Sequence, residues 1–164
     1  MAENENDNQL QLVTFLLGEE KYGVDIMDVK EIVRTREIRP IPNCPPYVAG
    51  ILNLRGIIIP IIDLHRRFQL RSAAQDDEEA LLSGIMVIDI DGMELGIFID
   101  RILRVVAIEA KELQSPPQMI SGIGAEYIQS VVSEDNGYLL ILNIRRIFDT
   151  RELAALGTLG RQAR

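Results

Sequence analysis

Two side chains in this sequence are candidates for a catalytic base or nucleophile, and neither has the partners that such chemistry needs. His65 is the only imidazole and stands beside Arg66 and Arg67, whose positive charges favour its neutral form. Cys44 is the only thiol, and a nucleophilic thiol needs a positioned base, normally a histidine. A long-range contact between the two would supply that base, but nothing in their spacing indicates one. We expect Cys44 to be a small apolar filler in a turn and His65 to be a surface or half-buried side chain.

The other residue types that carry chemistry are not arranged as a site. Residues 76–79 are an acidic run typical of a solvated segment, and Asp89, Asp91 and Asp100 have no spacing that selects a pair for acid–base work. Neither a GxxxxGK[ST] nor a GxGxxG phosphate loop occurs. One histidine and one cysteine exclude a multi-histidine or cysteine-rich metal site. We expect no metal, no cofactor and no catalysis; an enzyme that uses the lone histidine or cysteine is the catalytic alternative.

Composition narrows the class of protein further. The 164 residues include 17 Lys+Arg and 25 Asp+Glu, a formal charge of −8, which disfavours nucleic acid as a partner because phosphate binding needs clustered cations. A hydrophobic content of 47% is typical of a globular protein. The N-terminus has no apolar signal region, and no segment approaches the ~20 apolar residues of a membrane span. We therefore expect a cytoplasmic protein with no direct membrane insertion.

The apolar pattern predicts a duplicated β structure. Alternating apolar residues over 10–24 and 85–99, each with a turn signal in the middle, predict two β-hairpins. The two segments match without a gap at an offset of 73 residues, so that Gly23 coincides with Gly96. Residues 61–68 then resemble 141–148 at an offset of 80, and we place the seven extra residues (80 − 73) around 133–137. Chance similarity between aliphatic strands is the alternative.

A unit of about 70 residues buries too little surface to be stable alone, so we expect the two units to pack together with a groove between them. The predicted division is an acidic disordered tail over 1–9, one domain over 10–157, and a frayed end over 158–164. Within the domain we expect a first subdomain over about 10–70, an acidic linker over 71–82, a second subdomain over 83–148 and a C-terminal helix over 149–157. Asp149 and Glu152 indicate the start of that helix and Gly157 its end.

A further helix is predicted over 25–33. Apolar residues at 26, 29 and 33 share one face at helical spacing, and Asp25 is a plausible N-cap. Glu31 falls opposite that face and is therefore expected to be exposed.

The most unusual stretch covers residues 47–64, where Arg55 alone interrupts two hydrophobic runs between Gly50 and Gly56. One interpretation is a strand-end arginine with a local ion pair. The other is an arginine presented to a partner protein, because arginine is enriched among interface hot spots. Glu31 is a candidate ion-pair partner, and an exposed pair of this kind contributes about 0–1 kcal/mol.

Three strings, LVTFLLGEEKYGVDIMDVKEIV, PNCPPYVAGILNLRGIIIPIIDL and GIMVIDIDGMELGIFIDRILRVV, resemble the CheW family, the scaffold of bacterial chemotaxis arrays. The resemblance runs from about Leu10 to Leu156. It implies a mainly β fold of two packed, five-stranded SH3-like barrels with short helices and a C-terminal helix. It also implies a non-catalytic adaptor that couples chemoreceptors, the methyl-accepting chemotaxis proteins, to the regulatory domain of the histidine kinase CheA in membrane-associated arrays.

The resemblance implies site residues as well. The family's glutamate in V-x-E-I falls on Glu31 and its arginine in N-L-R-G on Arg55, and both are associated with receptor coupling. The implied receptor-binding residues are Val29, Glu31, Ile32, Gly50, Asn53, Leu54, Arg55, Gly96 and Ile97. We expect the helical hairpin tip of the receptor to lie in the groove, with Gly96 and Ile97 across it from the other residues. The candidate kinase contact is Pro40, Ile41 and Pro42.

Two alternatives remain open at this point. A small-barrel nucleic-acid-binding protein would need an exposed aromatic platform and a basic groove. An adaptor in a paralogous pathway outside chemotaxis would share the motifs and differ only in its partners.

Overall fold

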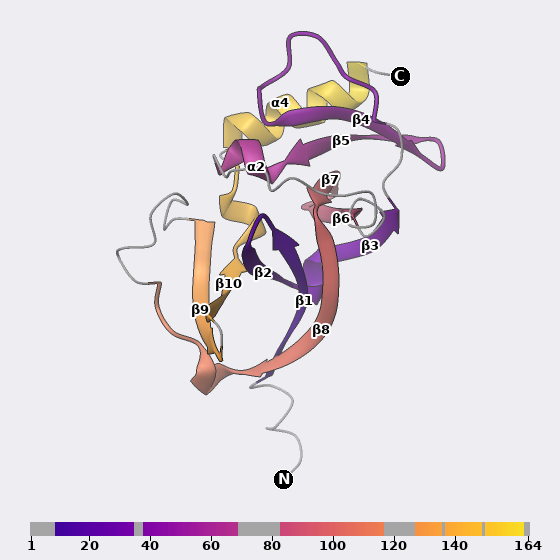
Figure 1. Ribbon diagram of the computed structural model, residues 1–164. Coiled ribbons are helices and arrows are strands. Elements are labelled where there is room, and N and C mark those ends of the chain that lie inside the picture. The colour runs from indigo at the N-terminus through magenta and orange to yellow at the C-terminus, as the bar shows by residue number, and fades with distance from the viewer. Residues whose placement is uncertain are drawn as a thin grey trace.

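The structure is a computed structural model that describes residues 9–34, 38–68, 83–116, 127–135, 137–148 and 150–162. Its strands form two five-stranded sheets, sheet A in the order β8-β1-β2-β10-β9 and sheet B in the order β3-β6-β7-β5-β4. Figure 1 shows sheet A in the lower half of the molecule and β4 and β5 of sheet B at the top. The mainly β fold predicted from the sequence is confirmed. The strands are β1 (Gln9–Leu17), β2 (Glu20–Asp25), β3 (Val29–Arg34), β4 (Val48–Leu54), β5 (Ile57–Asp63), β6 (Gly84–Ile90), β7 (Met93–Ile99), β8 (Arg101–Glu109), β9 (Ile128–Glu134) and β10 (Gly137–Leu142).

Each sheet is closed into a barrel by the segment that follows one of its edge strands. After β3, Arg39 exchanges two backbone hydrogen bonds with Ile51 of β4, at 3.0 and 2.9 Å. After β8, Gln114 does the same with Val131 of β9, at 2.9 and 2.8 Å. We call the two closed sheets barrel A and barrel B.

The strand orders confirm the internal duplication and correct the predicted division. Each strand of sheet A has a counterpart in sheet B whose number differs by five. The order β8-β1-β2-β10-β9 thereby corresponds, strand by strand, to β3-β6-β7-β5-β4. The subdomains predicted over 10–70 and 83–148 are wrong, however, because each hairpin pairs with strands from the other half. Barrel B is β3 to β7, whereas barrel A combines β1 and β2 with β8, β9 and β10. Neither half of the sequence can therefore form a barrel by itself.

The extra residues of the second copy are also placed differently from the prediction. The backbone N–H of Asp63 donates to the carbonyl of Tyr47 at 2.8 Å, and that of Asn143 donates to the carbonyl of Tyr127 at 2.9 Å. The two pairs are equivalent, so the offset of 80 (127 − 47) is already reached at Tyr127. The added residues therefore lie before Tyr127, in the connection between β8 and β9, and not around 133–137.

The helix predicted over 25–33 is wrong. A 3₁₀ turn, η1, covers Ile26–Asp28, and the chain then continues as β3. Asp25 does cap the turn, since its side chain accepts a hydrogen bond from the backbone N–H of Met27 at 2.9 Å. The apolar spacing fits a helix and a strand alike, and the antiparallel ladder with β6 decides for the strand.

The C-terminal helix α4 spans Thr150–Gln162 and passes through Gly157, so Gly157 does not end it as predicted. Residues 158–162 are accordingly helical rather than frayed. The acidic linker over 71–82 and residues 1–8 of the tail lie outside the described residues, whereas Gln9 is already part of β1.

Three apolar clusters stabilise this arrangement. The largest lies between the barrels and includes Phe15 and Tyr22 of sheet A and Met86 and Ile97 of sheet B, all 0% exposed. Each barrel also has its own interior. The interior of barrel B comprises Leu52, Leu54, Ile59, Ile61, Ile85 and Val87, and that of barrel A comprises Leu12, Val132, Leu139 and Ile141.

Arg67, at the end of the short helix α2 (Leu64–Arg67), fastens α4 to the barrels. Its guanidinium donates to both carboxylate oxygens of Glu152 at 2.8 and 2.9 Å and to the carbonyl of Ile147. The same group lies 4.9 Å from the ring centre of Tyr47 and 5.6 Å from that of Tyr127. These contacts hold the start of α4 over the junction of the two barrels.

Candidate functional site

The turn between β4 and β5 presents Arg55 to solvent. Arg55 and Gly56 both have positive φ angles, 54° and 85°, as a two-residue type I′ hairpin requires. The side-chain oxygen of Asn53 accepts a hydrogen bond from the backbone N–H of Gly56 at 2.9 Å, which stabilises the turn. The Arg55 side chain is 73% exposed.

Glu31 of β3 forms an ion pair with Arg55, as expected from the sequence. Its side chain is 26% exposed, so it is half-buried in a strand and not exposed on a helix as predicted. The neighbouring Lys30 pairs with Glu94 of β7. With Arg55 mostly in water, the Glu31–Arg55 pair contributes about 0–1 kcal/mol to folding, so its effect is to orient the two side chains rather than to stabilise the fold.

An apolar seam, comprising Val29 and Ile32 of β3 and Ile102 and Val105 of β8, lies where the two barrels meet. Ile32 and Val105 are 41% and 53% exposed, while Val29 and Ile102 are half-buried against the central core. A side chain added at Gly84 would lie 3.8 Å from Ile32 Cγ2 and 3.9 Å from Ile102 Cγ1, so these two residues flank the same backbone position from different barrels.

The duplication relates the two sides of this seam. Val29 and Ile102, and likewise Ile32 and Val105, are separated by the offset of 73. Sequence reasoning assigned Val29 and Ile32 to the site and missed Ile102 and Val105. Part of the signal was available, because Ile32 and Val105 are matched apolar residues in the duplication, but the exchange of strands that places Ile102 of β8 near Ile32 of β3 was not.

Four of the predicted site residues are buried and offer no side-chain surface. Leu54 and Ile97 are 5% and 0% exposed, and Gly50 and Gly96 are buried as well. A side chain at Gly50 would come within 2.3 Å of the carbonyl oxygen of Arg39, so this glycine permits the closure of barrel B.

The prediction that Gly96 and Ile97 face the other site residues across a groove is wrong. They lie in β7, which pairs in parallel with β5 in the same sheet as Glu31 and Asn53. A side chain at Gly96 would come within 2.4 Å of Ile61 Cδ1, so Gly96 is required for packing inside barrel B.

The candidate kinase contact lies in the connection between β3 and β4. Pro40 and Pro42 are exposed and Ile41 is half-buried. The Cys44 thiol donates to the carbonyl of Ile41 at 3.1 Å, and Cys44 packs against the central core. The thiol is thus a structural filler in this turn, as predicted.

His65 differs from the prediction in its charge. Its ring nitrogens lie 2.9 Å from an Asp100 oxygen and 3.4 Å from an Asp63 oxygen. Hydrogen bonds to Asp100 and then Asp63 raise the pKa of His65 to about 9, and the adjacent arginines do not keep it neutral. Asp100 also accepts from the backbone N–H of Gly18 at 2.7 Å, so the charged imidazole holds the β1–β2 turn and α2 together.

Comparison with known proteins gives a consistent result. The sequence model of the CheW-like domain matches residues 11–152. The chain is 53% identical over 154 residues to the chemotaxis protein CheW of Treponema pallidum, covering 94% of this chain and 91% of that one. The chain belongs to the CheW family. CheW of Klebsiella aerogenes is 28% identical over 144 residues, covering 88% of this chain and 84% of that protein.

The CheW fold is matched in a solved structure as well. The scaffolding protein TtCheW from Thermoanaerobacter tengcongensis superimposes with a TM-score of 0.77 at 31% identity, covering 87% of this chain and 90% of that one. This CheW protein is accordingly a chemotaxis adaptor that couples receptors to CheA. In the described part of the chain no helix is long and apolar enough to cross a membrane, and no group of three or more potential metal-ligating side chains occurs.

Proposed function

We propose that this CheW protein binds the helical hairpin tip of a chemoreceptor at the apolar seam, with the Glu31–Arg55 pair at its edge. The observation that carries the proposal is the exposure of Ile32 and Val105 at equivalent places on two barrels that meet. Exposed aliphatic side chains on either side of such a junction are the anchors that an amphipathic helix uses, and Ile32 and Ile102 flank the same backbone position there. A helix laid along the seam would contact both barrels at once.

The position of β3 explains how apolar and charged residues can serve one partner. Glu31 and Ile32 are consecutive, so their side chains point to opposite faces of the strand. Among the described strands β3 pairs with β6 alone, so it is an edge strand and its outer edge is open to a partner. A partner that passes over the edge contacts Ile32 on one side and the Glu31–Arg55 pair on the other.

Within this proposal the buried members of the predicted site act indirectly. Gly50, Leu54, Gly96 and Ile97 hold β4 and β7 in place beneath the contact surface, whereas Asn53 shapes the turn that carries Arg55. Pro40, Ile41 and Pro42 remain the proposed contact with the regulatory domain of CheA. The adaptor would then reach membrane-associated arrays through its receptors, and it would do so without catalysis.

Charge reversal at one residue and an acidic substitution at another test the receptor site. Arg55→Asp and Ile32→Glu are each expected to weaken binding to a purified receptor cytoplasmic fragment about tenfold or more, because they replace central contacts. Tyr138→Glu is the matched control, since Tyr138 is an exposed hydrophobic residue (55%) on β10, outside the seam. All three variants should melt within a few degrees of the wild type. An Arg55→Asp protein that fails to fold would make Arg55 structural, and unchanged binding by Ile32→Glu would remove the seam from the site.

Non-catalysis has its own test. A Cys44→Ser, His65→Gln double variant is expected to retain receptor and CheA binding and to support chemotaxis on soft agar. Loss of chemotaxis with both binding reactions intact would indicate a chemical role for one of the two side chains.

A further inference from the structure

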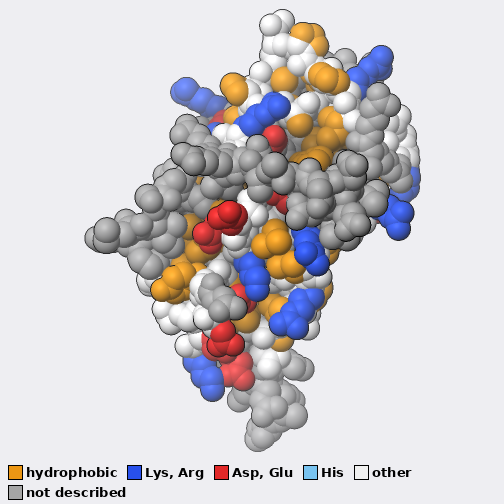
Figure 2. Space-filling model, viewed as in Figure 1, with side chains coloured by type: hydrophobic (Ala, Val, Ile, Leu, Met, Phe, Trp, Pro, Cys, Tyr) orange, Lys and Arg blue, Asp and Glu red, His pale blue; other side chains and the backbone are white. Residues whose placement is uncertain are grey.

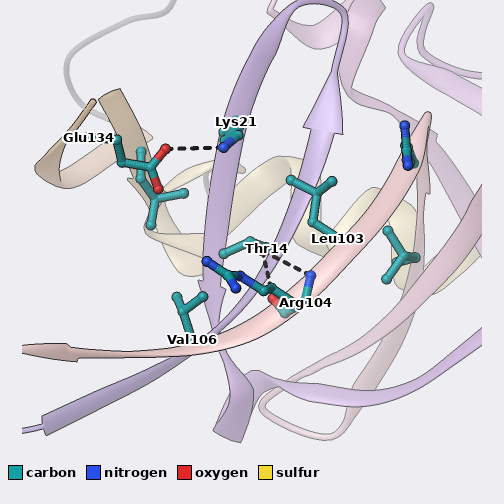
Figure 3. A pocket seen from close by; sticks show the side chains of 9 residues that line it. Thr14, Lys21, Leu103, Arg104, Val106 and Glu134 are labelled. Atoms are coloured by element: carbon teal, nitrogen blue, oxygen red, sulfur yellow. Dashed lines mark hydrogen bonds and ion pairs between the residues drawn. The ribbon is translucent and has the colours of Figure 1, made fainter. Parts of the chain in front are cut away.

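Barrel A contains a hollow of about 360 Å³ on its inner side, at the strand β8. Lys21, Arg101, Arg104 and Glu134 line it, and Leu103, Val106 and Leu139 supply apolar surface. Figure 3 shows Arg104 and Lys21 reaching over the hollow from β8 and β2, with Glu134 facing Lys21 from β9. Figure 2 shows basic side chains lying beside hydrophobic ones over the lower half of this face, where Figure 1 places barrel A.

The charges of this hollow are not balanced. Lys21 pairs with Glu134 at 3.2 Å, whereas neither Arg101 nor Arg104 has a carboxylate within ion-pair distance among the described residues. Two guanidinium groups therefore retain unused donors at one place, in a protein whose formal charge is −8. A planar guanidinium is suited to binding a carboxylate through two parallel hydrogen bonds.

The backbone beneath Arg104 is held in place. The Thr14 hydroxyl donates to the carbonyl of Arg104 at 2.6 Å and accepts from its N–H at 3.2 Å. These bonds span a bulge in the β1–β8 ladder, where the pairing passes from Val13↔Val105 to Phe15↔Ile102. The backbone of Arg104 is thus fixed, so that only its side chain has to be ordered when a ligand binds.

The duplication shows that this position has diverged in charge. At the offset of 73, Arg104 of barrel A corresponds to Glu31 of barrel B, and Thr14 corresponds to Val87. Glu31 is already paired with Arg55. Equivalent places on the two barrels therefore carry opposite charges and cannot select the same ligand.

A second hollow adjoins the first and adds acidic side chains to the surface. Lys21, Arg104 and Glu134 line both, and the second adds Glu19, Glu20, Asp135 and the exposed ring of Tyr138. The charge thus changes from basic at Arg101 and Arg104 to acidic at the β1–β2 and β9–β10 turns. A small dianion such as phosphate meets repulsion here that an extended segment of mixed charge does not.

We propose that this surface binds an extended peptide segment of a partner protein, with an acidic side chain at Arg104 and a basic side chain at the acidic turns. The methylene stem of the acidic residue would lie on Leu103, Val106 and Leu139. The basic residue would lie further along the segment, near Glu20 and Asp135; a spacing of three positions, used in the peptide below, extends about 10 Å at a rise of about 3.3 Å per residue.

The test is an NMR titration of the ¹⁵N-labelled full chain with the peptide acetyl-Glu-Ala-Ala-Lys-amide and with acetyl-Gln-Ala-Ala-Lys-amide. We expect saturable shifts at the amides of Thr14, Leu103 and Leu139 with the first peptide, and at least fivefold weaker binding of the second. Arg104→Gln should weaken the first peptide at least fivefold, and Arg101→Gln should weaken it as well. Arg145→Gln, which changes an exposed arginine on the 3₁₀ turn η4 (Ile144–Arg146), should leave it unchanged.

Several results would overturn the proposal. They are the absence of saturable shifts, equal binding of the glutamine peptide, indifference to Arg104→Gln, or inorganic phosphate binding as tightly as the peptide. The other candidate occupant is the chain's own acidic N-terminal tail, and deletion of residues 1–8 tests it. If the deletion moves the Leu103 and Leu139 signals and tightens peptide binding, the tail and not a partner protein occupies the site. Ile102 lines this hollow and also belongs to the apolar seam, so receptor-fragment binding by Arg104→Gln is measured as well. Wild-type receptor affinity together with weakened peptide binding would separate the two surfaces, whereas an equal loss of both would overturn this proposal.

Discussion

Equivalent glycines in the two barrels differ in how closely they are packed, and alanine substitutions measure the difference. A Cβ at Gly96 would lie 2.4 Å from Ile61 Cδ1 and 2.8 Å from Ile85 Cγ2, both of which belong to the interior of barrel B. A Cβ at Gly23 would lie 3.3 Å from Leu12 Cδ1, its nearest neighbour. Gly96→Ala therefore forces buried side chains to move, whereas Gly23→Ala requires an adjustment of a few tenths of an ångström.

The magnitude follows from two opposing effects. Overpacking a well-packed core costs about 1–3 kcal/mol. Replacing glycine by alanine reduces the entropy of the unfolded chain and returns about 0.4–1 kcal/mol. Gly96→Ala should thus lower the free energy of unfolding by about 1–2 kcal/mol, and Gly23→Ala should leave it within about 0.5 kcal/mol of the wild type.

Urea unfolding followed by far-UV circular dichroism measures both variants. The folded fraction of Gly96→Ala should still bind the receptor fragment with wild-type affinity, because Gly96 is buried in barrel B. Equal losses of stability in the two variants would refute the packing argument. A binding defect in a fully folded Gly96→Ala protein would instead assign Gly96 to the receptor-binding site, as the sequence predicted.

Three further predictions concern stability. Tyr22→Phe should raise the free energy of unfolding by about 1 kcal/mol in urea, because the Tyr22 hydroxyl is buried without a hydrogen-bond partner among the described residues, and a destabilised variant would reveal a partner. Arg67→Met and Glu152→Gln should each be destabilising, and their double-mutant cycle should give a coupling energy of about 1–3 kcal/mol; additive losses would contradict a direct interaction. The pKa of His65 is raised from 6.5 to about 9, so its contribution is complete below pH 6.5 and is lost as the pH rises through 9. His65→Gln should remove that decline from unfolding curves measured between pH 6 and 10, and an unchanged decline would assign it to another group.

Local features of the fold could be predicted from the sequence because local chemistry determines them. Asp91-Gly92 and Arg55-Gly56 both adopt positive φ angles in two-residue turns. Asp25 caps the turn that follows β2, and Arg55 pairs with Glu31. In each case the residue types themselves carry the conformational or electrostatic preference.

Strand partners could not be predicted in the same way. Alternating apolar residues specify which face of a strand is buried but not which strand lies beside it. The exchange that places β8 against β1 and β3 against β6 is a tertiary choice, and it determines which residues adjoin Ile32. Ile102 and Val105 were missed for this reason, and residues 29–33 were assigned to a helix because their spacing suits both structures.

The central claim is that the receptor hairpin lies on the seam between β3 and β8. An NMR titration of the ¹⁵N-labelled adaptor with an unlabelled receptor cytoplasmic fragment tests it most directly. The claim predicts that amide signals of residues 29–34 and 101–109 shift together and saturate at the same fragment concentration. Shifts confined to α4 or to β9 and β10, with β3 and β8 unaffected, would contradict it.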